Sequence, residues 1–189
     1  DGSRVAYQIS KGGADWSEAI IINAADKEML EDTLKDIKFS GISWKGNEGY
    51  YFSTYEKPKG SQLSAKTQYH KLYYHVLGTP RNQDKVIFGE GATQARYIGG
   101  YLTEDERFLI VSASNTGSGN KLYIQDLKDP KGKLVAIVDN FDSQQGILTN
   151  DGSRLFIETN LNAPNNRLVS VDFSKPTVEN WKDVIPETE

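Results

Sequence analysis

Short apolar stretches recur along this chain and are separated by residues that favour turns. Within "KLYIQDLKDP" (Lys121–Pro130), Leu122 and Ile124 fall on one face of an extended strand. Tyr123 and Gln125 fall on the opposite face. The Asp-Pro pair then ends the strand, because proline has no amide hydrogen to donate to a sheet ladder. The pattern therefore predicts a β-strand with apolar side chains on both faces of its sheet.

The same ten-residue pattern occurs three times, as "KLYYHVLGTP" at Lys71, "KLYIQDLKDP" at Lys121 and "RLVSVDFSKP" at Arg167. Each copy follows a turn and a run rich in β-branched and aromatic residues, which favour strands. A further apolar run comes before that unit and another comes after it. The repeat thus predicts four short strands in every 45–50 residues or so, which is typical of one blade of a β-propeller.

We therefore expect an all-β fold, a partial β-propeller of about four blades made of four-stranded antiparallel sheets. The first blade is expected to be incomplete, because nothing before its first turn matches an innermost strand. We expect the blades to span about 1–37, 38–90, 95–140 and 144–189. A chain that starts inside a blade is expected to be a piece of a longer protein, and its open strand edge is expected to promote self-association.

One segment has an alternative interpretation. In "DKEMLEDTLKDI" (Asp26–Ile37), Met29, Leu30, Leu34 and Ile37 also recur at a spacing that suits an amphipathic helix. The repeat favours an irregular outer strand with a charged loop, and the helix is kept as the alternative.

Composition limits the class of protein. Hydrophobic residues make up 37% and charged residues 25%, which suits a globular fold rather than a disordered chain. The net charge is −4 and basic residues form no stripe, so nucleic acid is not an expected partner. The longest apolar run is about five residues, against roughly 20 for a membrane span, so no membrane partner is expected. The chain has no cysteine, which excludes disulfides and favours the reducing cytoplasm, with the periplasm as the alternative.

The sequence contains no recognisable catalytic, cofactor or metal motif. No G-x-S-x-G nucleophile turn occurs, and "GEGATQ" (Gly89–Gln94) does not match a phosphate-binding loop. The two histidines, His70 and His75, are expected at the end of a polar loop and inside a strand. Asp139 and Asp142 could form a weak cation site, although a turn is the favoured interpretation. We therefore predict no catalytic residue, no cofactor and no metal ligand.

Three stretches resemble the propeller of the prolyl oligopeptidase family. The segment from Val5 to Trp44, which contains "DIKFSGISW", is similar to the family's "YxxSxxGSDW" and "LxDxLxxVKFSxxxW" motifs. "KLYYHVLGTP" is nearly a signature of that family. "TNDGSRLFIETNLNAPNNRLVSVDFSKPTVENWKDVIPE" resembles the "TNxGxxFxxxTNxxAPxxRLxxxDxxxPxxxxWxxxxPE" region. The resemblance covers essentially the whole chain, in order.

The resemblance implies a serine peptidase that cleaves short peptides after proline. In that family the catalytic Ser, Asp and His lie in an α/β-hydrolase domain, and a seven-bladed propeller covers it and filters substrates by size. This chain would be roughly blades one to four, its partner would be the hydrolase domain, and alone it is expected to be inactive. The loop at Glu56–His70 matches a mobile loop that the family uses near the domain interface.

The resemblance also implies three substrate contacts. Phe39 of "IKFS" matches a phenylalanine that lines the pocket for the residue two positions before the cleaved proline. Ile98 of "YIGG" matches an apolar residue of the same pocket, although both side chains could simply be propeller core. Ser114 of "SASNTGSGNKL" stands where the family has an arginine that contacts the peptide backbone, so that contact is in doubt. Since a propeller also serves as an interaction scaffold in other proteins, a non-catalytic scaffold is the alternative function.

Overall fold

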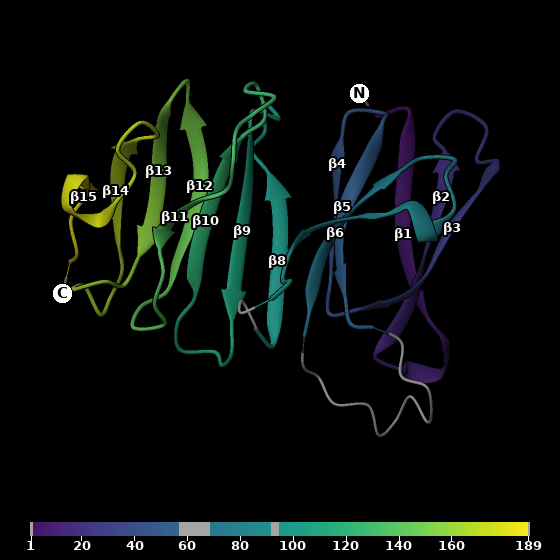
Figure 1. Ribbon diagram of the computed structural model, residues 1–189, viewed down its shortest axis with the longest axis horizontal. Helices are drawn as coiled ribbons and strands as arrows, with labels where there is room; N and C mark the ends of the chain where they lie inside the picture. The colour runs from purple at the N-terminus through teal and green to yellow at the C-terminus, as the bar shows by residue number, and fades with distance from the viewer. Residues whose placement is uncertain (1, 57–68, 92–94, 189) are drawn as a thin grey trace. The chain divides into compact units, whose positions relative to one another are not determined.

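The computed structural model of the protein describes residues 2–56, 69–91 and 95–188 (Figure 1). Fifteen β-strands lie in this part of the chain, and the helical segments described there are single 3₁₀ turns, which are η1 (Lys11–Gly13), η3 (Arg81–Gln83) and η4 (Val178–Asn180). The predicted all-β class is confirmed. Most of the predicted loop at Glu56–His70 lies outside the described residues. None of the described helical segments has the length and apolarity needed to cross a bilayer.

The chain divides into two compact units, residues 1–101 and 102–189. Two sheets lie in the first unit, and in each of them strands consecutive in sequence pair antiparallel. The first sheet has three strands, β1 (Arg4–Ser10), β2 (Trp16–Asn23) and β3 (Met29–Lys38). The second has four, β4 (Ile42–Lys45), β5 (Gly49–Thr54), β6 (Lys71–Val76) and β7 (Lys85–Phe88).

The remaining two sheets follow the same order of strands. The third contains β8 (Tyr97–Leu102), β9 (Phe108–Ser114), β10 (Lys121–Asp126) and β11 (Val135–Val138). The fourth contains β12 (Gln145–Asp151), β13 (Arg154–Thr159), β14 (Arg167–Asp172) and β15 (Lys182–Ile185). Four consecutive small sheets, the first one strand short, confirm the predicted tandem of blades.

The repeated ten-residue pattern is the third strand of the four-stranded sheets, since β6, β10 and β14 each begin at its first residue. Burial alternates along β10 as predicted. Leu122 and Ile124 are fully buried on one face, while Tyr123 and Gln125 are half-buried on the other.

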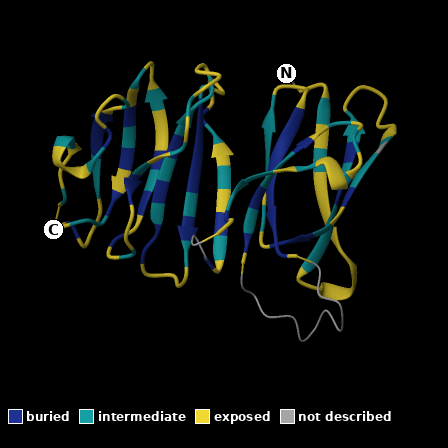
Figure 2. Ribbon diagram, viewed as in Figure 1, coloured by how far each residue is buried: buried dark blue, intermediate teal, exposed yellow. Residues whose placement is uncertain are grey.

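Each unit has a core between two packed sheets. In the first, Ala19, Ile21 and Leu34 from the three-stranded sheet contact Tyr50 and Phe52 of β5. Every residue of β5 is buried, as the dark blue ribbon shows in Figure 2. In the second unit, apolar side chains of β9 to β11 form one cluster with those of β12 to β14. Packing on the neighbouring sheet of the same unit buries one apolar face of each of these sheets.

Strand β3 is irregular but is not a helix, so the helical alternative for Asp26–Ile37 is wrong. Its pairing with β2 shifts register twice, between Ser17 and Ala19 and between Ile20 and Ile22. Such shifts mark bulges, which break the strict alternation of a strand. That is why the apolar residues of this segment also suit a helical period.

Candidate functional site

Phe39 directly follows β3 and has a backbone that bulky residues rarely adopt. Its φ is +54°, in the left-handed region, and 46% of the residue is exposed. The left-handed conformation costs a residue with a side chain roughly 1–2 kcal/mol, and exposure of a phenylalanine forgoes the stabilisation of burial. Strained backbone in proteins concentrates at functional sites. The conformation therefore marks Phe39 as a candidate binding residue.

Two tyrosines hold the Phe39 ring edge-on. The ring centroid of Tyr55 lies 6.2 Å away at an interplanar angle of 85°, and that of Tyr97 lies 5.7 Å away at 62°. Both geometries are favourable for aromatic pairs. The exposed ring therefore rests on a wall formed by β5's end and the start of β8.

The neighbouring residue, Lys38, adds a buried positive charge. Only 8% of its side chain is exposed, and its Nζ lies 3.3 Å from the carboxylate of Asp15. The same Nζ lies 5.3 Å from the Trp16 ring centroid and 5.1 Å from that of Phe39. A cation at this distance is attracted to an aromatic face, so it stabilises one side of the Phe39 ring.

His70 joins the Phe39 segment to β8. Its side chain is completely buried; Nε2 lies 2.9 Å from the carbonyl oxygen of Lys38, and the Ile98 amide donates to Nδ1 at 2.8 Å. A carbonyl can only accept and an amide N–H can only donate, so the imidazole is neutral with its proton on Nε2. Burial lowers the pKa of His70 to about 4, which keeps this state at neutral pH.

Tyr55 packs against the same imidazole, with ring centroids 4.3 Å apart. Its hydroxyl donates to the backbone carbonyl of Arg96, the residue before Tyr97. Burial raises the pKa of Tyr55 to about 12, so the hydroxyl stays protonated and remains a donor. We call Lys38, Phe39, Tyr55, His70, Tyr97 and Ile98 the aromatic cluster.

The structure brings two of the three predicted contacts together. Phe39 and Ile98 belong to the aromatic cluster, but Ile98 is only 1% exposed, with its side chain in the core. Gly89 packs closely there, since a Cβ on it would lie 3.0 Å from Cδ1 of Ile98. Ser114 ends β9 in the second unit and is half-buried. Substrate contact by these three residues stays a prediction.

The two histidines are not arranged as catalytic bases. His75, in β6, is buried with Nδ1 2.6 Å from Asp84 and Nε2 2.9 Å from Asp32. Burial alone would lower the pKa of His75, but hydrogen bonds to both carboxylates outweigh it and raise the pKa. Both nitrogens of each histidine are thus engaged by groups other than a serine hydroxyl. His75 is a strand residue, as predicted.

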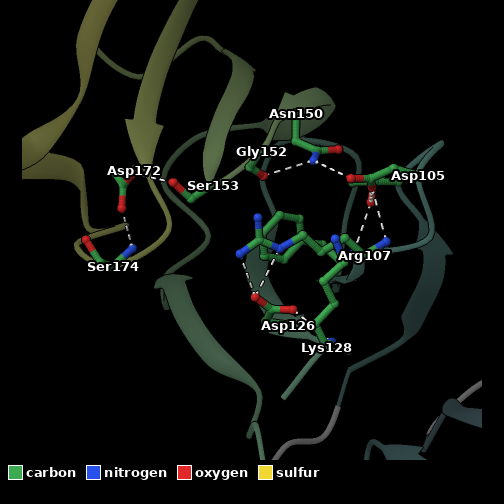
Figure 3. Close-up of polar contacts among 11 residues, drawn as sticks. Asp105, Arg107, Asp126, Lys128, Asn150, Gly152, Ser153, Asp172 and Ser174 are labelled. Carbon is green, nitrogen blue, oxygen red and sulfur yellow. Dashed lines mark hydrogen bonds and ion pairs between the residues drawn. The ribbon is translucent and has the colours of Figure 1, made fainter. Parts of the chain in front are cut away.

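Carboxylates of the second unit are also engaged (Figure 3). Asp126 accepts hydrogen bonds from the Arg107 guanidinium, at 2.9 Å from Nη2, and Asn150 joins the third sheet to the fourth by donating to Asp105 at 3.0 Å. Hydrogen bonds from Ser153 and Ser174 lower the pKa of Asp172 to about 2. These contacts stabilise turns next to the strands.

At the suggested Asp139–Asp142 cation site, the Asp139 carboxylate is hydrogen-bonded to two other side chains. The Asp139 carboxylate accepts from Lys121 Nζ at 2.8 Å and from the Tyr123 hydroxyl at 2.7 Å. A protein ammonium group therefore already binds this carboxylate. In the described ranges, no group of three or more His, Cys, Asp or Glu side chains is placed to hold a metal ion.

The second unit also has a polar cavity of about 280 Å³. It is lined by Asn120, Gln144, Gln145, Gly146, Glu158, Thr159 and Asn166. The Asn120 side-chain amide donates to the Gln145 carbonyl, and its oxygen accepts from the Gln145 backbone amide. The Gln145 side-chain amide donates to the Asn120 carbonyl. These two polar side chains are therefore already hydrogen-bonded within the protein.

Comparison with known proteins decides the family. The family model described as "Prolyl oligopeptidase, N-terminal beta-propeller domain" matches residues 1–189. The chain belongs to the prolyl oligopeptidase family. It is 50% identical over 188 residues to prolyl endopeptidases from Elizabethkingia miricola and Elizabethkingia meningoseptica, and the match covers 99% of this chain and 26% of each relative. The chain thus spans about a quarter of the length of these relatives.

Solved structures of the family share this fold. A chain from a structural and mechanistic analysis of two prolyl endopeptidases has a TM-score of 0.88 and 27% identity, over all of this chain and 27% of that one. Prolyl oligopeptidase B from Galerina marginata, bound to a 35mer hydrolysis and macrocyclization substrate, has a TM-score of 0.86 and 25% identity. It is matched over 28% of its length. The 189 residues are therefore similar to the N-terminal propeller part of prolyl oligopeptidases.

In this member of the prolyl oligopeptidase family, the resemblance points to Phe39, whose role stays a prediction, and not to the residues that hold its ring. Tyr97 lies in the "YIGG" stretch, but no local motif marks it, Tyr55 or His70 as a residue that supports Phe39. The sequence predicts His70 only as the end of a loop, because its two partners lie 32 and 28 residues away in sequence. The one available signal was that the chain has only two histidines.

Proposed function

We propose that this chain forms the substrate-facing part of the propeller of a serine prolyl endopeptidase that cleaves short peptides after proline. The 50% identity to two prolyl endopeptidases over nearly the whole chain supports the proposal. The proposed partner is the enzyme's own α/β-hydrolase domain, which would carry the catalytic Ser, Asp and His. The propeller would act sterically, by admitting only short chains to a covered active site.

The observation that carries this proposal is the strained, exposed ring of Phe39. With Tyr55 and Tyr97 behind it, the ring offers a rigid apolar surface to the peptide residue two positions before the cleaved proline. Ile98 and Ser114 are proposed as further contacts, Ile98 through the wall that its buried side chain supports.

The test uses the full-length protein that contains these residues and a chromogenic peptide with proline before the reporter group. Hydrolysis abolished by a serine-directed inhibitor is expected. Phe39→Ala is expected to lower kcat/KM by about tenfold for peptides with a bulky apolar residue two positions before the proline. A full-length protein that leaves the reporter intact would contradict the proposal and favour the scaffold.

The 189-residue chain by itself is expected to leave the same reporter intact. Both histidines are fully engaged, and His70 is buried, so neither can act as general base for a serine. The measurement is reporter release by purified chain at high concentration. Turnover that co-purifies with the chain and resists serine-directed inhibitors would contradict this expectation.

Two further proposals concern the surroundings of the chain. The exposed apolar side chains on edge strand β1 support association with a second copy of this chain. We also propose a cytoplasmic location, with the periplasm as the alternative, and cell fractionation followed by immunoblotting distinguishes the two.

A further inference from the structure

We propose that His70 is a positioning residue for substrate selection: its imidazole sets the distance between the Phe39 segment and β8, and thereby the preference for an apolar residue two positions before the cleaved proline. This inference rests on the proposed peptidase function. His70 is fully buried and out of reach of a substrate, so it would act through Phe39.

The two side-chain hydrogen bonds of His70 end on backbone atoms next to Phe39 and next to Tyr97, whose rings contact each other. Nε2 donates to the carbonyl of Lys38, one residue before Phe39. Nδ1 accepts from the amide of Ile98, one residue after Tyr97. Because Phe39 and Tyr97 lie edge to face at 5.7 Å, the imidazole spans the same gap from the buried side.

The backbone hydrogen bond of His70 does not make this link. Its backbone amide donates to Ala95 at 3.3 Å, which holds the loop end but not the Phe39 segment. Tyr55 packs on the imidazole at 4.3 Å and on the Phe39 ring at 6.2 Å, so movement of the imidazole is transmitted to the ring. A residue in a strained backbone conformation keeps it only when its surroundings over-determine that conformation. His70 supplies two of those constraints.

Removal of the link takes a buried hydrogen-bond partner from the Lys38 carbonyl and from the Ile98 amide, which is unfavourable. The backbone then shifts to reach water, and the Phe39 ring loses its fixed relation to Tyr97. A displaced Phe39 ring discriminates poorly between a substrate with a bulky apolar side chain and one with glycine at that position. The overall fold keeps its apolar core, since that core lies between the two sheets of the first unit.

The test measures two reporters with the full-length enzyme, one with a bulky apolar residue and one with glycine two positions before the proline. His70→Asn can keep the acceptor for Ile98, and His70→Gln can keep the donor to Lys38. Each is expected to lower the ratio of the two kcat/KM values, by roughly tenfold when both bonds are lost in His70→Ala. The control for lost stability is His75→Asn at the other histidine, which is expected to destabilise the protein and to leave the ratio unchanged.

A double variant shows whether His70 acts through Phe39. If it does, His70→Asn combined with Phe39→Ala has the same ratio of kcat/KM values as Phe39→Ala alone. The reason is that the ring positioned by His70 is already absent in Phe39→Ala. Additive losses, or His70 variants that keep the wild-type ratio while Phe39→Ala lowers it, would overturn the inference and leave the proposed function intact. A wild-type enzyme with no proline-specific activity would instead overturn the proposed function.

Discussion

Phe39 shows how one residue can be both unfavourable for folding and suited to binding. Its left-handed backbone turns the chain sharply after β3, and its ring is left half in solvent between two tyrosines. A glycine would relieve the backbone strain but would remove the ring. The protein therefore keeps phenylalanine at a position where the backbone conformation alone favours glycine.

The strain at Phe39 predicts the order of stability of two variants. Phe39→Gly is expected to have a free energy of unfolding about 1 kcal/mol higher than Phe39→Ala, because only glycine adopts a positive φ without a steric penalty. The pair is matched, since both variants lack the ring. Urea unfolding followed by tryptophan fluorescence measures the difference, and an alanine variant as stable as the glycine variant would contradict the left-handed conformation.

Gly89 is expected to tolerate no side chain. Its φ is +103°, and a Cβ there would lie 2.6 Å from the carbonyl oxygen of His70 and 3.0 Å from Ile98. Gly89→Ala is expected to destabilise the protein by roughly 1–3 kcal/mol. The control is Gly99→Ala in β8, where a Cβ meets no atom within 4 Å, with an expected change within about 0.5 kcal/mol. Equal unfolding midpoints for the two variants would refute the close contact at Gly89.

At the scale of elements, a buried ion pair joins the first sheet to the second. Asp32 lies in β3, His75 lies in β6, and Asp84 comes just before β7. Asp32 also accepts from the amide of Gly78, so its carboxylate fixes the turn after β6. The two sheets are thus held by charge as well as by their shared apolar core.

This ion pair predicts a pH dependence of stability. Because its pKa is raised in the folded protein, the contribution of His75 is complete below the unfolded pKa of about 6.5 and is lost as pH rises through the folded pKa. His75→Gln is expected to cost about 3 kcal/mol at low pH, since it leaves two buried carboxylates without their cation. Urea unfolding between about pH 6 and about pH 9 should show that the difference in free energy of unfolding between the wild type and His75→Gln decreases as pH rises. An advantage that grows with pH would show that His75 is neutral when folded.

The strands were predictable from sequence because their causes are local. Alternating apolar residues, a closing proline and a repeated spacing define β10 and its counterparts within ten residues each. The burial of His70 was not predictable in the same way, because its two hydrogen-bond partners lie 32 and 28 residues away in sequence. The Phe39 ring likewise contacts Tyr55 and Tyr97, which only the folded chain brings next to it. For Phe39, only resemblance to a family gave the position, and it gave no conformation.

At the scale of the whole molecule, the first sheet presents an apolar edge. Strand β1 is an outer strand of that sheet, and its Val5, Tyr7 and Ile9 are 43%, 42% and 41% exposed. Residues two apart share one face of a strand, so these side chains form a single stripe. Their cross-strand partners Ile20 and Ile22 extend it onto β2. A contiguous apolar surface on an edge strand favours pairing with another chain.

The 189-residue chain is therefore expected to self-associate through β1. Light scattering after size exclusion should give a mass above the 21.1 kDa of one chain, and the share of larger species should rise with concentration. Tyr7→Lys combined with Ile9→Glu should restore the monomer, because opposite charges interrupt the stripe without changing the net charge. Leu148→Lys is the control, since that leucine is 61% exposed but lies in β12 of the second unit. A wild-type chain that stays monomeric at every concentration would contradict the proposal. Loss of association in the Leu148 variant would show that the interface lies on the fourth sheet instead.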